Sequence, residues 1–156
     1  MIAAAAVLHS TPAPACRPEA IAVRLGRSEG AAGTIYVSIV FTNTGRVRCT
    51  LRGFPGVSSV DRAGRQIGSP ARWVGTRVTR VALAPHHSGS AIYGQAQAVN
   101  FPISRCHPRS ARGLRVYPPN QTRARRLISK HVACSSTRVG DSMVGPVVPG
   151  VTGQVG

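Results

Sequence analysis

The chain has 156 residues, a length that suits one domain with a single hydrophobic core. Its 20 basic side chains against 4 acidic ones give a net charge of +16, and only 4 % of its residues are aromatic, so the core must consist mainly of aliphatic side chains. With so few carboxylates, spread along the sequence, we expect no acid–base catalysis and no enzyme.

Residues 1–15 form a leader that is typical of export. An apolar run from Ile2 to Leu8 is followed by Ala13-Pro14-Ala15, the small-x-small pattern of a cleavage site, although no basic residue precedes the run. We interpret the segment as a signal-like or truncated leader. A flexible alanine-rich leader and lipid attachment at Cys16 are the alternatives. No apolar run elsewhere approaches the roughly 18 residues that a transmembrane helix requires.

The rest of the chain alternates apolar and polar residues over short segments. In the clearest of them, residues 35–42, every odd-numbered side chain is apolar and lies on one face of a strand. Glycine, proline and aspartate separate the segments, as in the hairpin turn predicted over Asp61–Gly64. No helical pattern extends over ten residues. Short strands are therefore predicted within residues 19–26, 35–42, 49–68, 77–83, 90–99, 113–119, 125–132 and 141–148, which favours a sandwich or a barrel.

The four cysteines predict two disulfides, because their number is even and no Cys-x-x-Cys pair suggests a zinc or redox site. Three pairings are possible. We expect Cys16 with Cys49 and Cys106 with Cys134, since each closes a loop of about thirty residues, worth roughly 3 to 4 kcal/mol of chain entropy. Disulfides persist in oxidising compartments, so the pattern favours a protein outside the cytoplasm.

Five stretches together resemble one protein family. They are GTIYVSIVFTNTG (33–45), CTLRGFPGVSSVDRAGRQIG (49–68), VALAP (81–85), CHPRSARGLRVYPP (106–119) and ACSS (133–136). From about Cys16 to Val148 the chain is similar to an uncharacterised secreted domain widespread in actinobacteria, catalogued as domain of unknown function four-two-three-two. The resemblance implies an exported or lipid-anchored envelope protein with an immunoglobulin-like sandwich and two disulfides, and it supplies no catalytic residues. One departure is His86, which stands where the family tends to have glycine.

A serine-nucleophile motif is suggested by Gly140-Asp141-Ser142. A protease of that kind needs two barrels, and a lipase needs a histidine downstream of Ser142, which this sequence lacks. A turn into the final strand is therefore the expected structure of the motif, and we expect no catalytic residue.

Two histidine groups could suggest a metal. His86 and His87 are adjacent, so in extended backbone they point to opposite faces. The other group, Cys106-His107 with His131 and Cys134, lacks the usual spacing of zinc ligands, because Cys106 directly precedes His107. We expect no metal and no cofactor.

An arginine-rich segment over residues 105–130 is the best binding candidate. Its cations could gather on one face, with Tyr117 as a stacking surface, and attract a polyanion. The alternative is a solvated surface in an arginine-biased proteome. The candidate anion-binding residues are Arg105, Arg109, Arg112, Arg115, Arg123, Arg125, Arg126 and Lys130.

These observations predict an all-β fold, an immunoglobulin-like antiparallel β-sandwich of about 7 to 9 strands over residues 16–148, with a flexible tail at 149–156. We expect a secreted or cell-envelope protein, a non-enzymatic binding or structural module. Its partner is expected to be an anionic cell-wall polymer, a phospholipid surface or another envelope protein, with no specific nucleic acid. The alternatives are an intracellular nucleic-acid-binding protein with reduced cysteines and, less favoured, an extracellular hydrolase.

Overall fold

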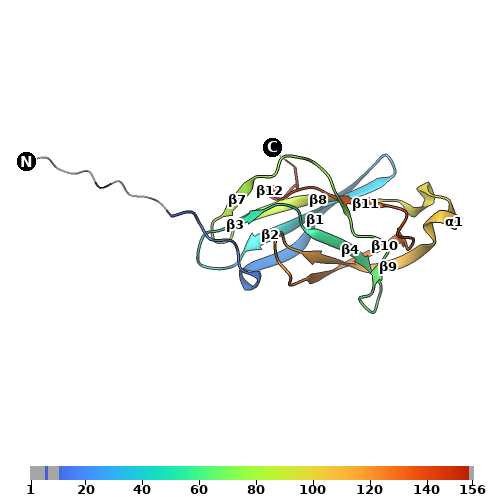
Figure 1. The fold of residues 1–156 in the computed structure, drawn as a ribbon, viewed down its shortest axis with the longest axis horizontal. Coiled ribbons are helices and arrows are strands. Elements are labelled where there is room, and N and C mark those ends of the chain that lie inside the picture. Colours follow the sequence, from blue (N-terminus) through green and yellow to red (C-terminus); the bar gives the residue numbers. More distant parts are fainter. Residues whose placement is uncertain (1–5, 7–10, 155–156) are drawn as a thin grey trace, which may run out of the picture.

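The computed structural model describes residue 6 and residues 11–154. Two layers of strands pack face to face in an elongated sandwich (Figure 1). The short helices η2 (Ala98–Asn100) and α1 (Ile103–Cys106) lie at one end, and β3 (Cys49–Arg52) and β7 (Arg80–Leu83) lie toward the other. A third short helix, η1 (Pro18–Ala20), precedes the first strand.

The larger sheet has the strand order β1-β2-β8-β11-β6, and β12 also pairs with β8. All its pairs are antiparallel except β11 with β6, which is parallel. Its strands are β1 (Ile21–Ala31), β2 (Thr34–Asn43), β6 (Arg72–Trp73), β8 (Ser88–Ala96), β11 (Ser142–Val144) and β12 (Val148–Pro149).

The smaller sheet has the order β10-β9-β4-β5, and β3 pairs with β7 in a separate ribbon. Its strands are β4 (Gly56–Val60), β5 (Gln66–Ile67), β9 (Pro108–Tyr117) and β10 (Arg125–Cys134). Over the described residues there are 12 strands, and the excess over the predicted number consists of two-residue strands. The all-β sandwich is thus confirmed, while its immunoglobulin-like topology stays a prediction.

The main core lies between the layers and is mainly aliphatic, with Phe41 and Tyr93 as its buried aromatic side chains. The alternation predicted for residues 35–42 places Ile39 and Phe41 in it, each with none of its surface exposed. Fully burying side chains of this size stabilises a fold by about 1.5 to 3 kcal/mol each. The two sheets and the ribbon all contribute buried residues, among them Leu51, Val57, Val81, Leu83, Ala91, Tyr93, Leu114 and Val116.

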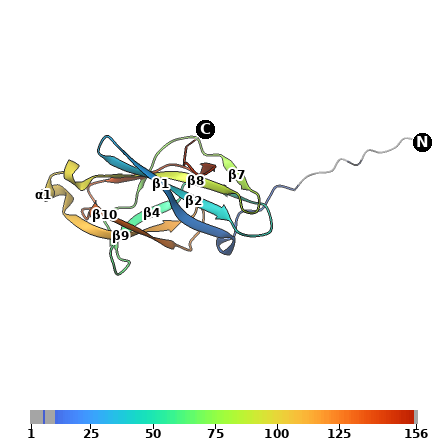
Figure 2. The ribbon, with the colours of Figure 1, turned by 180° about the vertical axis from the view of Figure 1, so that it is seen from behind.

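Both sheets have an irregular edge on the same side of the sandwich, where β1 and β10 lie close together (Figure 2). The register of β1 against β2 shifts between Leu25 and Ser28. The register of β10 against β9 shifts between Ile128 and His131. Such β-bulges bend a strand and disrupt its ladder, and they are common beside functional sites. Here residues at both register shifts line a cleft between the two sheets.

Both predicted disulfides are present. Cys16–Cys49 ties the start of the domain to β3, and Cys106–Cys134 ties α1 to the end of β10. The second bridge is buried in a small cluster with Val139, against which Ala98 and Phe101 pack. This bridge therefore fixes η2, α1 and the segment between them onto the sandwich.

The two ends of the described chain each make hydrogen bonds to the sandwich. Most of the predicted leader falls outside the described residues, although Thr50 donates a hydrogen bond to the carbonyl of Pro14. Within the predicted flexible tail, Pro149, Gly150 and Gly153 contact β8. Ser90 Oγ donates to the carbonyl of Gly150 and accepts from the N–H of Gly153, which is itself buried. Ser90 is itself fully buried, and its two hydrogen bonds hold this segment in place.

The turn containing His86 is left-handed at that residue, with φ of 68°. Glycine adopts this conformation at least cost, which explains why glycine is usual at this position in the family that the sequence resembles. The His86 N–H donates to the carbonyl of Asn43 at 2.7 Å, and this contact helps to hold the turn.

Candidate functional site

The β4–β5 hairpin presents two arginines on a rigid turn. Asp61 Oδ1 accepts hydrogen bonds from the N–H groups of Ala63 and Arg65, both at 2.9 Å, and Oδ2 pairs with Arg65 Nε at 3.1 Å. The backbone hydrogen bond from Arg65 contributes most to lowering the pKa of Asp61, so the carboxylate stays ionised. The turn predicted over Asp61–Gly64 is confirmed, and Asp61 is occupied in shaping it.

Arg126 reaches this hairpin from β10, crossing β9 on the way. Its guanidinium donates to the carbonyls of Asp61 and Arg62, each at 2.9 Å. Gly113 lies beneath this side chain, and a Cβ added there would come within 2.8 Å of the Leu127 carbonyl oxygen, so the two strands require glycine at this position. Arg115 lies directly opposite Arg126 in the β9–β10 ladder and donates to Gln66 Oε1 at 2.6 Å. Two like charges thus face each other beside the turn.

A shallow hollow of about 490 Å³ lies between the hairpin and β9. It is lined by Arg62, Arg65 and Arg112 together with Ser110, and the carboxylate of Asp61 is the negative group on its wall. We call Arg62, Arg65, Arg112, Arg115 and Arg126 the hairpin arginine cluster. Three of the predicted anion-binding residues thus lie beside a hairpin from a different part of the sequence.

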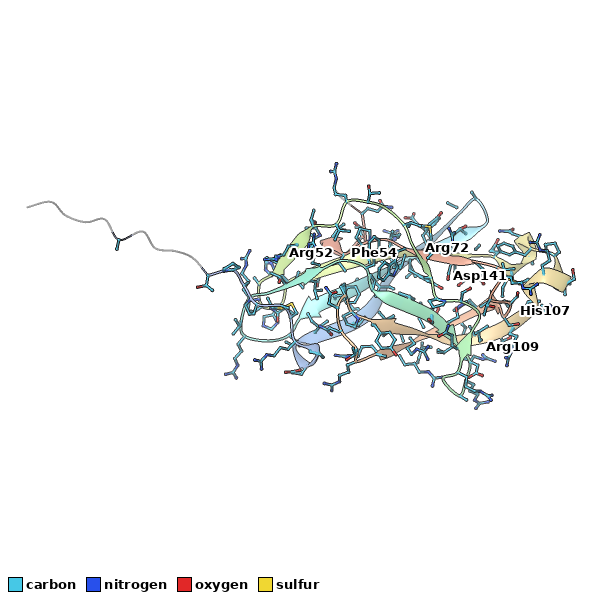
Figure 3. The ribbon with its side chains drawn as sticks, viewed as in Figure 1. Arg52, Phe54, Arg72, His107, Arg109 and Asp141 are labelled. Carbon is cyan, nitrogen blue, oxygen red and sulfur yellow. A yellow bond between two sulfur atoms is a disulfide. The ribbon has the colours of Figure 1, made fainter. Side chains whose placement is uncertain are left out.

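The eight predicted anion-binding residues divide between several places. Three of them, Arg112, Arg115 and Arg126, belong to the hairpin arginine cluster. Arg105 and Arg109 lie toward the α1 end, where Figure 3 also shows His107, and Arg123 is exposed between β9 and β10. The prediction did not include Arg62, which lies in the predicted hairpin turn, or Arg65, which directly follows it.

Arg125 and Lys130, the last two of the eight, lie away from the hairpin arginine cluster. Arg125 turns toward the N-terminal segment, where its guanidinium donates to the carbonyls of Pro18 and Ile21 and so ties β1 to β10. Lys130 remains exposed at the rim of a second hollow, between the sheets.

That second hollow is a cleft of about 900 Å³ between the edges of the two sheets. Its walls come from β1, β2 and β8 on one side and from β10 on the other, and η2 and α1 close the end of the sandwich. Apolar side chains dominate the walls, including Leu25, Ile35, Val37 and Phe101. A cleft of this size is within the range of small-molecule sites.

Polar groups at the floor of the cleft satisfy one another. Tyr93 Oη donates to Gln95 Oε1 at 2.6 Å, and Gln95 Nε2 donates to Asp141 Oδ2 at 3.0 Å. The same carboxylate oxygen accepts from the backbone N–H of Cys134 at 2.7 Å. His131 lies beside them, with Nε2 2.8 Å from Ser59 Oγ. Burial raises the pKa of the Tyr93 hydroxyl, which stays protonated at neutral pH.

Comparison with known proteins places the sequence in a family. The model of the family described as Domain of unknown function (DUF4232) matches residues 16–148. The chain belongs to this family. No curated protein and no solved structure matches the sequence.

Membership in DUF4232 confirms the resemblance drawn from the sequence motifs. The family brings no molecular function, but the two disulfides point to an extracytoplasmic protein, because such bonds persist in oxidising compartments. Over the part of the chain that the structure describes, no helix is long and apolar enough to cross a membrane.

Two motifs singled out in the sequence have structural roles. Asp141 is buried and holds Gln95 and the end of β10, while Ser142 begins β11, so this motif enters a strand. Cys106 and Cys134 are joined to each other, which removes both thiolates from the metal-binding alternative. Among the described residues, no three side chains of metal-binding type come together.

His131 makes stability depend on pH. Burial lowers its pKa below the ordinary value of 6.5, and this outweighs the opposite effects of a hydrogen bond at Ser129 and of the Asp141 charge. The unfolded chain therefore binds a proton that the folded protein excludes. The stability that the neutral, buried His131 contributes is fully present above about pH 6.5. It is lost as the pH falls through the pKa of His131 in the unfolded chain and then through its pKa in the folded protein.

We expect the melting temperature to fall between pH 7.5 and pH 5, and His131→Gln to make this decline shallower by removing the buried imidazole. Thermal unfolding monitored by circular dichroism across this range measures the effect. Replacing the exposed His107 by glutamine serves as the control. An unchanged decline in His131→Gln would show that other groups set the pH dependence.

Proposed function

We propose that this DUF4232 protein is an exported, non-enzymatic binding module of the cell envelope, and that its hairpin arginine cluster binds an anionic partner. The observation that carries the proposal is the convergence of Arg62, Arg65 and Arg112 around one hollow. Arg115 and Arg126 add two more positive charges beside the same hairpin. Repeating phosphate or carboxylate groups on a cell-wall polymer fit such a site best.

The charge balance around the cluster supports this proposal. Within the described part of the chain, the one ion pair joins Arg65 to Asp61. Arg126 is bound to carbonyl groups and Arg115 to an amide oxygen, so neither positive charge is neutralised. The buried Nε of Arg115 has no hydrogen-bond partner among the residues that the structure describes. An anion at the hollow would relieve the repulsion between neighbouring guanidinium groups.

Guanidinium groups also suit the chemistry of such a partner. Their planar N–H groups bind phosphate and carboxylate oxygens in pairs, and they are hydrated more weakly than an ammonium group. Hydrogen bonds at Asp61, Gly64 and Arg65 fix the backbone of the hairpin that carries Arg62 and Arg65, which reduces the backbone entropy lost on binding. A shallow, open hollow accommodates a chain better than a small enclosed molecule.

Neutralising two arginines at the hollow should weaken binding to a polyanion. For Arg62→Gln with Arg112→Gln, we expect the Kd for inorganic polyphosphate to rise by about fivefold for each charge removed. The slope of log Kd against log salt should fall by about 2. Isothermal titration at several salt concentrations measures both quantities.

The matched control is Arg77→Gln with Arg80→Gln, which removes two exposed charges outside the cluster. An equal loss of affinity in the two double variants would show a diffuse field and no defined site. Tight binding to vesicles of phosphatidylglycerol without binding to polyphosphate would assign the partner to the membrane. Stronger binding to single-stranded DNA than to polyphosphate would favour the nucleic-acid alternative.

A further inference from the structure

The mouth of the inter-sheet cleft exposes an unusual amount of apolar surface. Val99 in η2 is 87 % exposed and Ile103 in α1 is 77 % exposed, and both line the cleft. Ile35 of β2 and Val132 of β10 continue the same rim from opposite sheets. Contiguous apolar surface around a hollow is costly in water and is typical of binding sites.

The architecture holds the cleft open before any ligand is present. The bulges of β1 and β10 lie on its two sides, and Leu25 and Ser28 face it from one of them, Ser129 and His131 from the other. The Cys106–Cys134 bridge fixes the end wall, because Ala98 and Phe101 pack against it and also line the cleft. A preformed hollow reduces the entropy cost of binding.

The formal charge along the lining of the cleft is positive only. Among its lining residues Lys130 is the single formally charged side chain, it stays exposed at the rim, and no carboxylate lines the cleft. The polar side chains of Tyr93 and Gln95 inside the cleft already have hydrogen-bond partners, so a ligand needs no charged group there. The walls thus suit an apolar chain, and the rim suits one negative charge.

We propose that this cleft binds a long-chain carboxylate, with the acyl chain between the sheets and the carboxylate at Lys130. This site is separate from the hairpin arginine cluster and uses none of its residues. The acyl chain would cover the apolar rim that now faces water. Each methylene buried in this way should tighten binding by about fourfold, until the chain outgrows the cleft.

The test uses the full chain and cis-parinaric acid, a long polyene carboxylate that fluoresces more strongly in apolar surroundings, below its micelle concentration. Ser129→Phe should raise the Kd by on the order of tenfold or more, because the ring would occupy the space of the acyl chain. Ala98→Phe fills the cleft from η2 and replaces Ser129→Phe if that variant unfolds. Ile128→Phe is the matched control, since Ile128 is on the same strand but does not line the cleft.

Competition with saturated carboxylates tests the depth of the site. Dodecanoate, tetradecanoate and hexadecanoate should displace the probe with steadily rising affinity, and Lys130→Gln should weaken each of them by roughly two- to fivefold, while Lys130→Arg does not. Equal affinities along this series, or equal displacement by hexadecyltrimethylammonium, would overturn the proposal. So would equal losses in Ser129→Phe and Ile128→Phe.

The two binding sites are distinguished by crossing the variants. Arg62→Gln with Arg112→Gln should leave the probe affinity unchanged, and Ser129→Phe should leave polyphosphate binding unchanged. Loss of probe binding in the arginine variant would mean that the carboxylate binds at the cluster, which would overturn the cleft proposal alone.

Discussion

Replacing Cys106 and Cys134 together by alanine is expected to lower the free energy of unfolding by about 3.5 kcal/mol. The bridge closes a loop with a sequence separation of 28 residues, and both cysteines are buried. Its loss frees α1 from β10 and loosens the packing of Ala98 and Phe101, so the cleft should lose its end wall. Denaturant unfolding without reductant measures the stability, and cis-parinaric acid fluorescence reports on the cleft.

The matched control is the double alanine variant of Cys16 and Cys49, whose bridge spans a similar separation of 33 residues near β3. We expect a comparable loss of stability with unchanged affinity for the probe, because this bridge contacts no part of the cleft. A loss well under 1 kcal/mol in the Cys106–Cys134 variant, or the same change of probe affinity in both, would contradict this assignment.

Asp141→Ala is expected to destabilise the protein by about 3 kcal/mol. The carboxylate is only 6 % exposed and accepts from both the Cys134 N–H and Gln95 Nε2. Removing it leaves two buried donors without that partner and loosens the support of Gln95 for Tyr93. Urea unfolding at pH 7.5 measures the loss.

Asp141→Asn separates the hydrogen bonds from the charge, because it keeps the size of the side chain and one acceptor oxygen. We expect a smaller loss, near 1 kcal/mol. Asp61→Ala, in the exposed hairpin, should cost less than Asp141→Ala, since water can replace the carboxylate at Ala63 and Arg65. Equal stability of Asp141→Ala and the native protein would show that the buried network is dispensable.

Local sequence patterns predicted the parts of the fold that depend on neighbours in the chain. Alternation over residues 35–42 placed Ile39 and Phe41 in the core, and the turn chemistry of Asp61–Gly64 predicted the hairpin. The disulfide pairing also followed from loop lengths. These features have short-range causes that a single sequence contains.

Long-range pairing explains what the sequence could not predict. The cluster depends on β9 lying between β4 and β10, which brings Arg112 and Arg126 beside Arg62. The hydrogen bond from Arg125 to the Pro18 carbonyl joins residues more than one hundred positions apart, so local patterns did not predict it. The cleft depends on bulges in two edge strands, and bulges shift the alternation from which faces are predicted.

The most direct measurement of the proposed function is a polyphosphate titration of ¹⁵N-labelled protein, followed by two-dimensional NMR at moderate salt. The amide signals of residues 61–65, residues 110–115 and Arg126 should shift first, with a common Kd, and the double variant Arg62→Gln with Arg112→Gln should abolish these early shifts. Early shifts scattered over arginines on every element, or confined to Arg105 and Arg109 near α1, would contradict a binding site at the hairpin.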